Sequence, residues 1–188
     1  MVVALAGRRI DAEDASSLRF PTENIEKIKE KLGLFFVEKK PEWLVSSGAC
    51  GADLIALDVA GELEINRKMI LPFDAETFKS TSVTDRPGDW GILFDRIYGE
   101  LKKESNVVDL GYDKDEEDIY EKANFDILNE ADKIYSELKN GNSQPGGAKK
   151  IAVIIWEGKP KDSGDTTDHF RQEAINRGYE IREINSLH

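Results

Sequence analysis

A loop of small residues offers the clearest chemistry in the chain. Ser46-Ser47-Gly48-Ala49-Cys50-Gly51-Ala52-Asp53 stands between an apolar run and a helical pattern. Glycines let the backbone approach a ligand closely, and the unpaired N–H groups at a helix start favour an anion such as phosphate. The spacing matches neither the dinucleotide-binding nor the P-loop fingerprint, and a tight turn without a ligand is the alternative interpretation. The ligand contacts that we expect from this loop are Ser47, Gly48, Cys50, Gly51 and Asp53.

A pair of arginines follows the first apolar run, in the segment Gly7-Arg8-Arg9. A guanidinium group grips phosphate or carboxylate through two parallel hydrogen bonds. The chain carries 26 Lys and Arg against 37 Asp and Glu, a formal charge of −11, so a bound anion needs local cations of this kind. We therefore expect Gly7, Arg8 and Arg9 to contact the ligand. The alternative is a surface salt bridge from these arginines to Asp11, Glu13 or Asp14.

Glycine and hydroxyl residues recur before a helix near the end of the sequence. The run Trp156-Glu157-Gly158 is followed by Gly164-Asp165-Thr166-Thr167-Asp168-His169. Two such turns at one edge of a sheet would hold a nucleotide's phosphate and sugar from two sides, whereas a single turn would be an ordinary helix cap. From this turn we expect Gly164, Thr166 and Thr167 to contact the ligand.

The lone cysteine, Cys50, allows a second kind of chemistry. Near a helix start its thiolate would be favoured, and His169 would be the obvious base for a nucleophile. We favour the alternative in which Cys50 fills a tight loop and His169 is a surface or site-lining residue. With one cysteine and two histidines, the sequence excludes an internal disulfide and a multi-cysteine zinc site, and we expect neither a metal nor a cofactor.

Strands alternating with helices must position these segments. Strands are expected at Val2–Ala6, Trp43–Val45, Met69–Leu71, Val107–Leu110, Ile151–Trp156 and Tyr179–Ile184. Helices are expected from Thr22 to Pro41, near Ala52–Gly61, and at Trp90–Leu101, Glu116–Leu138 and Thr166–Arg177, with Asp74–Gly88 as a long loop. This order predicts an α/β fold, a Rossmann-like three-layer sandwich with a mainly parallel sheet, in which ligands bind beyond the carboxyl ends of the strands.

Composition narrows the function further. The negative charge disfavours a protein that coats DNA or RNA, so we expect no bulk nucleic acid as a partner. The apolar run before Gly7 is too short for a secretory signal, and no apolar stretch approaches the roughly 18 residues of a membrane span. We expect a single cytoplasmic domain over residues 1–188 without a membrane partner, and the sequence leaves assembly into a homo-oligomer open.

Taken together, the motifs resemble those of the SLOG superfamily. This group includes the LOG phosphoribohydrolases, the DprA DNA-uptake proteins and many nucleotide-sensing domains. The matching segments are Gly7-Arg8-Arg9-Ile10-Asp11, Arg19-Phe20-Pro21, Ser47–Asp53, Leu71-Pro72-Phe73 and Gly164-Asp165-Thr166. The resemblance is closest to the sensor-like branch and implies a Rossmann-like domain that binds a nucleotide or a nucleotide-derived ligand. It would place Gly48, Gly51 and Asp53 in the first binding loop and Gly164, Thr166 and Thr167 in the second.

The sequence departs from the hydrolases where their catalytic residues lie. LOG hydrolases carry Pro-Gly-Gly-x-Gly-Thr-x-Glu-Glu, and with Thr166 on the motif threonine, Asp168 and His169 stand in place of the glutamates. The helix expected at Glu116–Leu138 also lacks the arginine that the hydrolases use. We therefore expect ligand sensing first and N-glycosidic hydrolysis second, with Asp168 and His169 as candidate catalytic residues. A third alternative is a protein-interaction module that uses the acidic segment 109–121.

Overall fold

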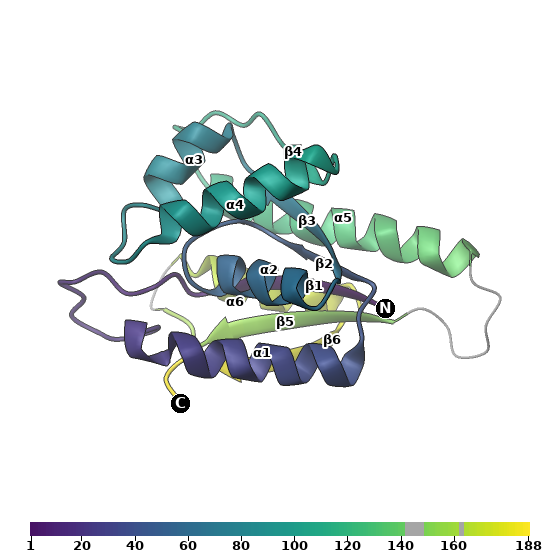
Figure 1. Ribbon diagram of the computed structural model, residues 1–188, viewed down its shortest axis with the longest axis horizontal. Helices are drawn as coiled ribbons and strands as arrows, with labels where there is room; N and C mark the ends of the chain where they lie inside the picture. The colour runs from purple at the N-terminus through teal and green to yellow at the C-terminus, as the bar shows by residue number, and fades with distance from the viewer. Residues whose placement is uncertain (142–148, 162–163) are drawn as a thin grey trace.

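A parallel sheet lies between two layers of helices (Figure 1). The computed structural model describes residues 1–141, 149–161 and 164–188. Within these residues the sheet has six strands in the order β4-β3-β2-β1-β5-β6, and each neighbouring pair is parallel. The strands are β1 (Val2–Gly7), β2 (Trp43–Ser46), β3 (Asn66–Leu71), β4 (Val107–Asp109), β5 (Lys150–Trp156) and β6 (Glu180–Asn185). The predicted Rossmann-like α/β sandwich is confirmed.

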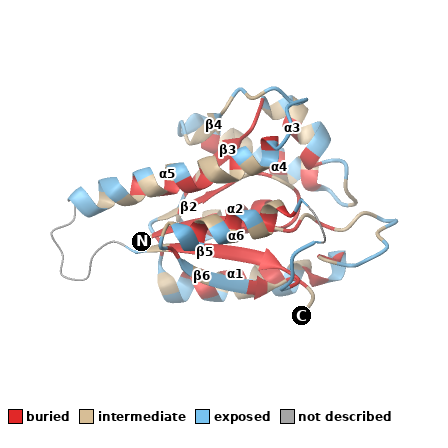
Figure 2. Ribbon diagram, turned by 180° about the vertical axis from the view of Figure 1, so that it is seen from behind, coloured by how far each residue is buried: buried red, intermediate tan, exposed pale blue. Residues whose placement is uncertain are grey.

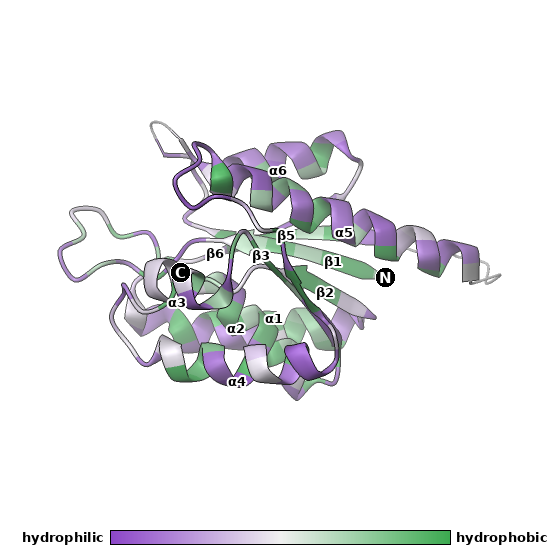
Figure 3. Ribbon diagram, turned by 90° about the horizontal axis from the view of Figure 1, so that it is seen from above, coloured by the Kyte–Doolittle hydropathy of each residue, from purple (hydrophilic) through white to green (hydrophobic). Residues whose placement is uncertain are grey.

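Alternating side chains of β1 pack on the two opposite faces of the sheet. The helices are α1 (Ile25–Lys39), which follows a short 3-10 turn (Thr22–Asn24), α2 (Ala52–Glu62), α3 (Ala75–Ser82), α4 (Trp90–Lys103), α5 (Ile119–Gly141) and α6 (Thr166–Asn176). Val3 and Leu5 pack with α1, α2 and α4, whereas Val2 and Ala4 pack with α5 and α6. Burial on both faces explains why β1 and β5 are continuous apolar runs in the sequence. Figure 2 shows β5 as buried, and Figure 3 shows the hydrophobic sheet between the helix layers.

The segment 74–88 corrects one expectation, because it contains the helix α3 and is not an uninterrupted loop. The Asp74 side chain accepts a hydrogen bond from the backbone N–H of Thr77 at 2.9 Å and so caps this helix. Only Phe78 and Ser82 of α3 are buried. A helix of eight residues with one large apolar side chain shows no clear hydrophobic period in the sequence, since most of its residues face solvent.

Most other boundaries differ by one to three residues from those expected, and β3 and α5 are examples. β3 begins at Asn66, before the apolar run, because the charged side chain of Arg67 is buried and satisfied there. Its guanidinium donates to the Leu57 carbonyl at 3.2 Å and to Glu100 at 2.9 Å. α5 spans Ile119–Gly141 rather than Glu116–Leu138.

β1 lies where the strand order reverses. β2, β3 and β4 follow on one side of β1, and β5 and β6 lie on the other. α2 starts after β2 and α6 starts after β5, so both helix starts meet the end of β1 at the carboxyl edge. This is the position at which open parallel sheets bind ligands.

Among the described residues, no helix is both long enough and apolar enough to cross a bilayer.

Candidate functional site

A cavity of about 570 Å³ opens at the carboxyl edge of the sheet, and its size suits a small organic ligand. Its wall comes from the loops after β1, β2, β3 and β5, from α3, and from the first turns of α5 and α6. The predicted contacts that lie in this wall are Gly7, Arg8, Arg9, Ser47, Asp53, Gly164, Thr166 and Thr167. The structure thus brings both glycine-bearing turns to one cavity.

Three further predicted contacts, Gly48, Cys50 and Gly51, are not part of the wall that the described residues form. Gly51 has a φ of +97°, and a Cβ there would lie 2.8 Å from the carbonyl oxygen of Arg8. A Cβ on Gly48 would lie 3.2 Å from the side chain of Met69. Close packing is therefore sufficient to explain why these two positions are glycine. Gly51 lets this loop pack against the loop after β1, and Gly48 lets it pack against the core.

Cys50 is completely buried in the same loop. Its backbone N–H donates to the carbonyl of Ser82 at 3.0 Å. Burial raises the pKa of the Cys50 thiol, and the nearby charge of Arg9 only partly opposes this effect. A buried thiol with a raised pKa matches the interpretation of Cys50 as a residue that fills a tight loop.

The candidate catalytic residues Asp168 and His169 are not part of the wall formed by the described residues. The Asp168 carboxylate lies 2.9 Å from the guanidinium of Arg171, one turn along α6. His169 Nδ1 lies 3.0 Å from a carboxylate oxygen of Glu121 on α5, and the His169 side chain is 46% exposed. Both side chains thus have polar partners on helices outside the described wall.

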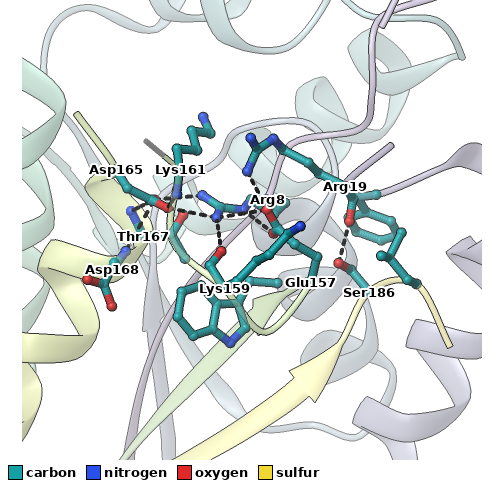
Figure 4. A network of polar contacts seen from close by, with 12 residues as sticks. Arg8, Arg19, Glu157, Lys159, Lys161, Asp165, Thr167, Asp168 and Ser186 are labelled. Atoms are coloured by element: carbon teal, nitrogen blue, oxygen red, sulfur yellow. Dashed lines mark hydrogen bonds and ion pairs between the residues drawn. The ribbon is translucent and has the colours of Figure 1, made fainter. Parts of the chain in front are cut away.

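A buried network surrounds Arg8 (Figure 4). Its guanidinium donates from Nε to Glu157 at 2.6 Å, from Nη1 and Nη2 to Asp165 at 2.6 and 2.8 Å, and from Nη2 to the Lys159 carbonyl at 3.1 Å. Arg19 donates to the same Glu157 carboxylate. The side chains of Arg8, Glu157 and Asp165 are all less than 5% exposed. Arg8 thus lines the cavity with its guanidinium already bound by carboxylates of the chain.

These partners replace the surface salt bridge that the sequence suggested for Arg8. That alternative paired it with Asp11, Glu13 or Asp14, and it is wrong because Arg8 is buried and its partners come from residues 157–165. Asp11 instead accepts the backbone N–H of Arg19 at 2.9 Å, which shapes the loop between β1 and α1.

The start of α6 is occupied by the chain's own carboxylate. Asp165 caps this helix by accepting the backbone N–H groups of Thr167 at 3.0 Å and Asp168 at 3.2 Å. It also accepts the N–H of Lys161 at 2.7 Å. Burial alone would raise the pKa of Asp165, but the hydrogen bonds from Arg8 and the backbone hold it well below its usual range. A carboxylate that is ionised at neutral pH therefore stands where the second turn was expected to receive phosphate.

Three residues of the cavity wall carry buried polar atoms without a hydrogen-bond partner. Among the described residues, the buried side-chain nitrogens and oxygens without a hydrogen-bond partner are Arg9 Nε, Asp53 Oδ1 and Arg86 Nε. All three residues line the cavity. Another guanidinium nitrogen of Arg9 donates to Asp85, and Arg86 Nε lies 3.9 Å from the other oxygen of that carboxylate. Both guanidinium groups are therefore within reach of one anionic group.

Asp53, in the first turn of α2, is 8% exposed. Burial raises its pKa to about 7, while the backbone of Ala49, the hydroxyl of Ser46 and the charge of Arg9 act in the opposite direction. A carboxyl group with a near-neutral pKa in a cavity wall is suited to accept a hydrogen bond from a ligand or to exchange a proton with it.

Several residues of the cavity wall were not among the predicted contacts. Arg86, Lys161 and Arg19 add positive charge, Tyr120 adds a ring that is 44% exposed, and Asn124 donates to the carbonyl of Thr166 at 2.9 Å. The sequence carried a signal for Arg86, which follows the third strand in the chain and precedes a Pro-Gly pair. For Tyr120 and Asn124 the only signal was their position in the first turns of a long helix.

Within the described ranges, His, Cys, Asp and Glu side chains form no group of three that could hold a metal ion. Comparison of the sequence with models of protein families and with curated proteins returned no match. The resemblance to the SLOG superfamily therefore stays a prediction.

Proposed function

We propose that this protein binds a nucleotide or a nucleotide-derived ligand in the cavity at the carboxyl edge of its sheet, and that it acts as a sensor of that ligand. The observation that carries the proposal is the composition of the wall. Five cationic side chains line the cavity in a chain whose formal charge is −11, against the two carboxylates of Asp11 and Asp53. The cations are Arg8, Arg9, Arg19, Arg86 and Lys161.

Not all of this charge is available to a ligand. Glu157 and Asp165 neutralise Arg8 and Arg19, and Asp85 lies against Arg9. What remains is one positive charge in excess around Arg9 and Arg86 and the charge of Lys161, with the carboxyl groups of Asp11 and Asp53 in the same wall. Local positive charge of this size attracts a small anion and leaves the overall repulsion of a nucleic acid backbone in place.

The rest of the wall suits a sugar and a base. Gly7, Ser47, Asn124 and Thr166 supply backbone and small polar groups, which are the kind of contacts that fix a ligand's orientation. The exposed ring of Tyr120 offers a surface for stacking, and its edge packs on Phe73 with the ring centres 6.4 Å apart. A ligand with one anionic and one aromatic end fits this combination.

Titration calorimetry and thermal unfolding with AMP, GMP, CMP, UMP and ADP-ribose test the proposal. At about 100 times its Kd, a bound nucleotide adds roughly 2.7 kcal/mol to the free energy of unfolding. Replacement Arg9→Ala is expected to weaken binding, and it is expected to reduce the loss of affinity that added salt causes. Arg182→Ala is the matched control, because it removes the same charge from an exposed position on the edge strand β6. If none of these nucleotides binds at millimolar concentration, the proposal is wrong.

Hydrolysis of an N-glycosidic bond is the second candidate function, and Asp53 is the observation that favours it. Its near-neutral pKa and its place in the wall suit a general base that activates water beside a sugar. Asp168 and His169 do not stand in that position. Chromatography for free base after incubation with nucleoside monophosphates tests this function. Base release that disappears in Asp53→Asn, while nucleotide binding persists, would make hydrolysis the leading function.

A further inference from the structure

The three unpartnered atoms of the cavity wall define a pattern of donors and acceptors. Arg9 Nε and Arg86 Nε are donors, and Asp53 Oδ1 is an acceptor. Buried polar groups are almost always hydrogen-bonded, and leaving one unpaired is costly. Three such groups around one cavity therefore indicate a ligand that presents an acceptor to the arginines and a donor to the aspartate.

We propose that the cavity selects a ligand in which a phosphate lies beside a hydroxyl group, with the phosphate bound by Arg9 and Arg86 and the hydroxyl donating to Asp53. The phosphorylated ribose of a nucleotide has this chemistry. The inference rests on the proposed function and specifies which end of the ligand each side of the cavity receives.

Asp85 shows that the two arginines converge. One oxygen of its carboxylate accepts from Arg9, and the other lies 3.9 Å from Arg86 Nε. The side chains of Arg9, Arg86 and Asp85 are each about one-third exposed. Two guanidiniums that share one carboxylate keep an excess charge and several free N–H groups, which is the arrangement that binds a phosphate through paired hydrogen bonds.

The helix starts on either side do not compete for the phosphate. At α6, Asp165 accepts three backbone N–H groups and two hydrogen bonds from Arg8 and is 4% exposed. A phosphate there would meet an ionised carboxylate in place of free donors. At the start of α2, the N–H of Ala52 donates to Arg8 O at 3.1 Å and that of Cys50 donates to Ser82 O at 3.0 Å. Besides Lys161, the cationic donors of the wall with charge to spare are thus Arg9 and Arg86.

Asp53 is suited to recognise a hydroxyl next to that phosphate. Its side chain is nine-tenths buried and lines the cavity, and the positive charge of Arg9 is near enough to lower its pKa. The backbone of Ala49 and the hydroxyl of Ser46 also act on this carboxyl group, and Oδ1 is the oxygen without a partner. If a ligand's hydroxyl pairs with Oδ1, an analogue without that hydroxyl binds less tightly, because this oxygen is then left unpaired. Asp53 is therefore the expected determinant of ribose recognition.

The test uses the purified full chain and titration calorimetry. Whichever of AMP, GMP, CMP and UMP binds most tightly is compared with its nucleoside, which lacks the phosphate, and with its dideoxy analogue, which lacks both ribose hydroxyls. The parent is expected to bind the nucleotide at least about tenfold more tightly than either analogue, as for loss of one hydrogen bond to a charged group.

Four variants separate the two contacts. Arg9→Ala and Arg86→Ala are expected to weaken nucleotide binding about tenfold or more and to leave nucleoside binding unchanged. Asp53→Leu, of similar volume but without an acceptor, is expected to bind nucleotide and dideoxy analogue equally and to keep the preference for phosphate. Asp53→Asn is the conservative variant, because it retains the shape of the side chain and one acceptor oxygen. A thermal melt of each variant verifies that it is folded. Thr166→Val, at the α6 turn, is the control for the position of the phosphate and is expected to keep the parent's preference for the nucleotide over the nucleoside.

The outcomes distinguish this inference from the proposed function. If a nucleotide binds but the arginine variants keep the parent's phosphate preference, or if Thr166→Val removes it, the phosphate lies elsewhere and the inference is overturned. Equal affinity of the parent for the nucleotide and its dideoxy analogue overturns the role of Asp53. Failure of every nucleotide and nucleoside to bind overturns the proposed function, and the inference with it.

Discussion

Arg8 and Asp165 are joined by two parallel hydrogen bonds across 157 positions of the sequence, from Nη1 to Oδ1 at 2.6 Å and from Nη2 to Oδ2 at 2.8 Å. Each side chain is 4% exposed. Because Asp165 also caps α6, this contact fixes the loop after β1 relative to the start of that helix. Two walls of the cavity are thereby held in place without a ligand, which lowers the ordering cost of binding.

Replacement Asp165→Asn is expected to lower the free energy of unfolding by about 3 kcal/mol, because it leaves the buried Arg8 with one carboxylate partner fewer. Asparagine is a good N-cap residue, so the change isolates the ion pair from the cap. Urea denaturation at neutral pH measures the loss. Asp168→Asn is the control, since Asp168 pairs only along the surface of α6. A loss no larger than that of the control would show that the buried pair contributes little.

The same carboxylate predicts acid sensitivity. The pKa of folded Asp165 lies below its ordinary value of 3.8, so its ionised form stabilises the fold. This stability is fully present above about pH 4 and is lost as the pH falls toward the folded pKa. In Asp165→Asn, denaturation midpoints measured over this acid range are expected to change less with pH than those of the parent. Parallel profiles would contradict the assignment.

The effect of pH on stability that is expected from Asp53 is opposite to that expected from Asp165. Its pKa in the folded protein is about 7, against an ordinary value of 3.8, so folding takes up a proton between these values. The free energy of unfolding of the parent should therefore fall as the pH rises through this window, and the full penalty should be present above about pH 7. Asp53→Asn lacks the penalty and is expected to be more stable than the parent by a few kcal/mol at about pH 8, but equal to it near pH 4. Urea titrations at a series of pH values test this, and a stability difference that does not change with pH would refute it.

Gly51→Ala is expected to destabilise the protein by about 2 kcal/mol or more. Its φ of +97° is strained for any residue with a side chain, and the new Cβ would lie 2.8 Å from the carbonyl oxygen of Arg8. Gly33→Ala, on α1 where a Cβ meets nothing within 4 Å, is the matched control and should stabilise the helix by up to about 1 kcal/mol. Thermal unfolding compares the two. Equal effects of the same sign would contradict the packing argument.

Cys50 is expected to react slowly with an aromatic disulfide reagent in the native protein. Its side chain is fully buried, and burial raises the pKa of the thiol, so little thiolate is available. The protein in denaturant provides the unhindered rate for comparison. Native labelling as fast as in denaturant would revive the interpretation of Cys50 as a nucleophile.

The framework of the site could be predicted from the sequence because it depends on local patterns. Apolar runs such as β1 and β5 place strand ends, and parallel strands end at the same edge of a sheet. Gly7 and Gly164 were therefore expected at the same edge of the sheet, and both lie in the cavity wall. The sequence pattern did not predict α3, because this helix is rich in Thr and Ser and buries only the side chains of Phe78 and Ser82.

The partners of each side chain could not be predicted in this way. Arg8 was expected to face a ligand or nearby acids, but its carboxylates come from the far end of the chain, and local spacing carries no information about them. Likewise, the loop sequence did not reveal that Gly51 and Cys50 would face inward while Asp53 lines the cavity. Arg86 was not predicted, because it follows α3, a helix that the sequence pattern did not reveal.

The central place of β1 has a consequence for how the chain is made. Val2 of β1 pairs with Lys150 of β5, so one edge of β1 has no neighbour until the ribosome has released the later strand. Until then a nascent chain exposes an apolar strand edge, which is a template for aggregation. The cavity also lacks the walls from α5 and α6 at that stage, so this site is complete only after the later strands and helices have been made.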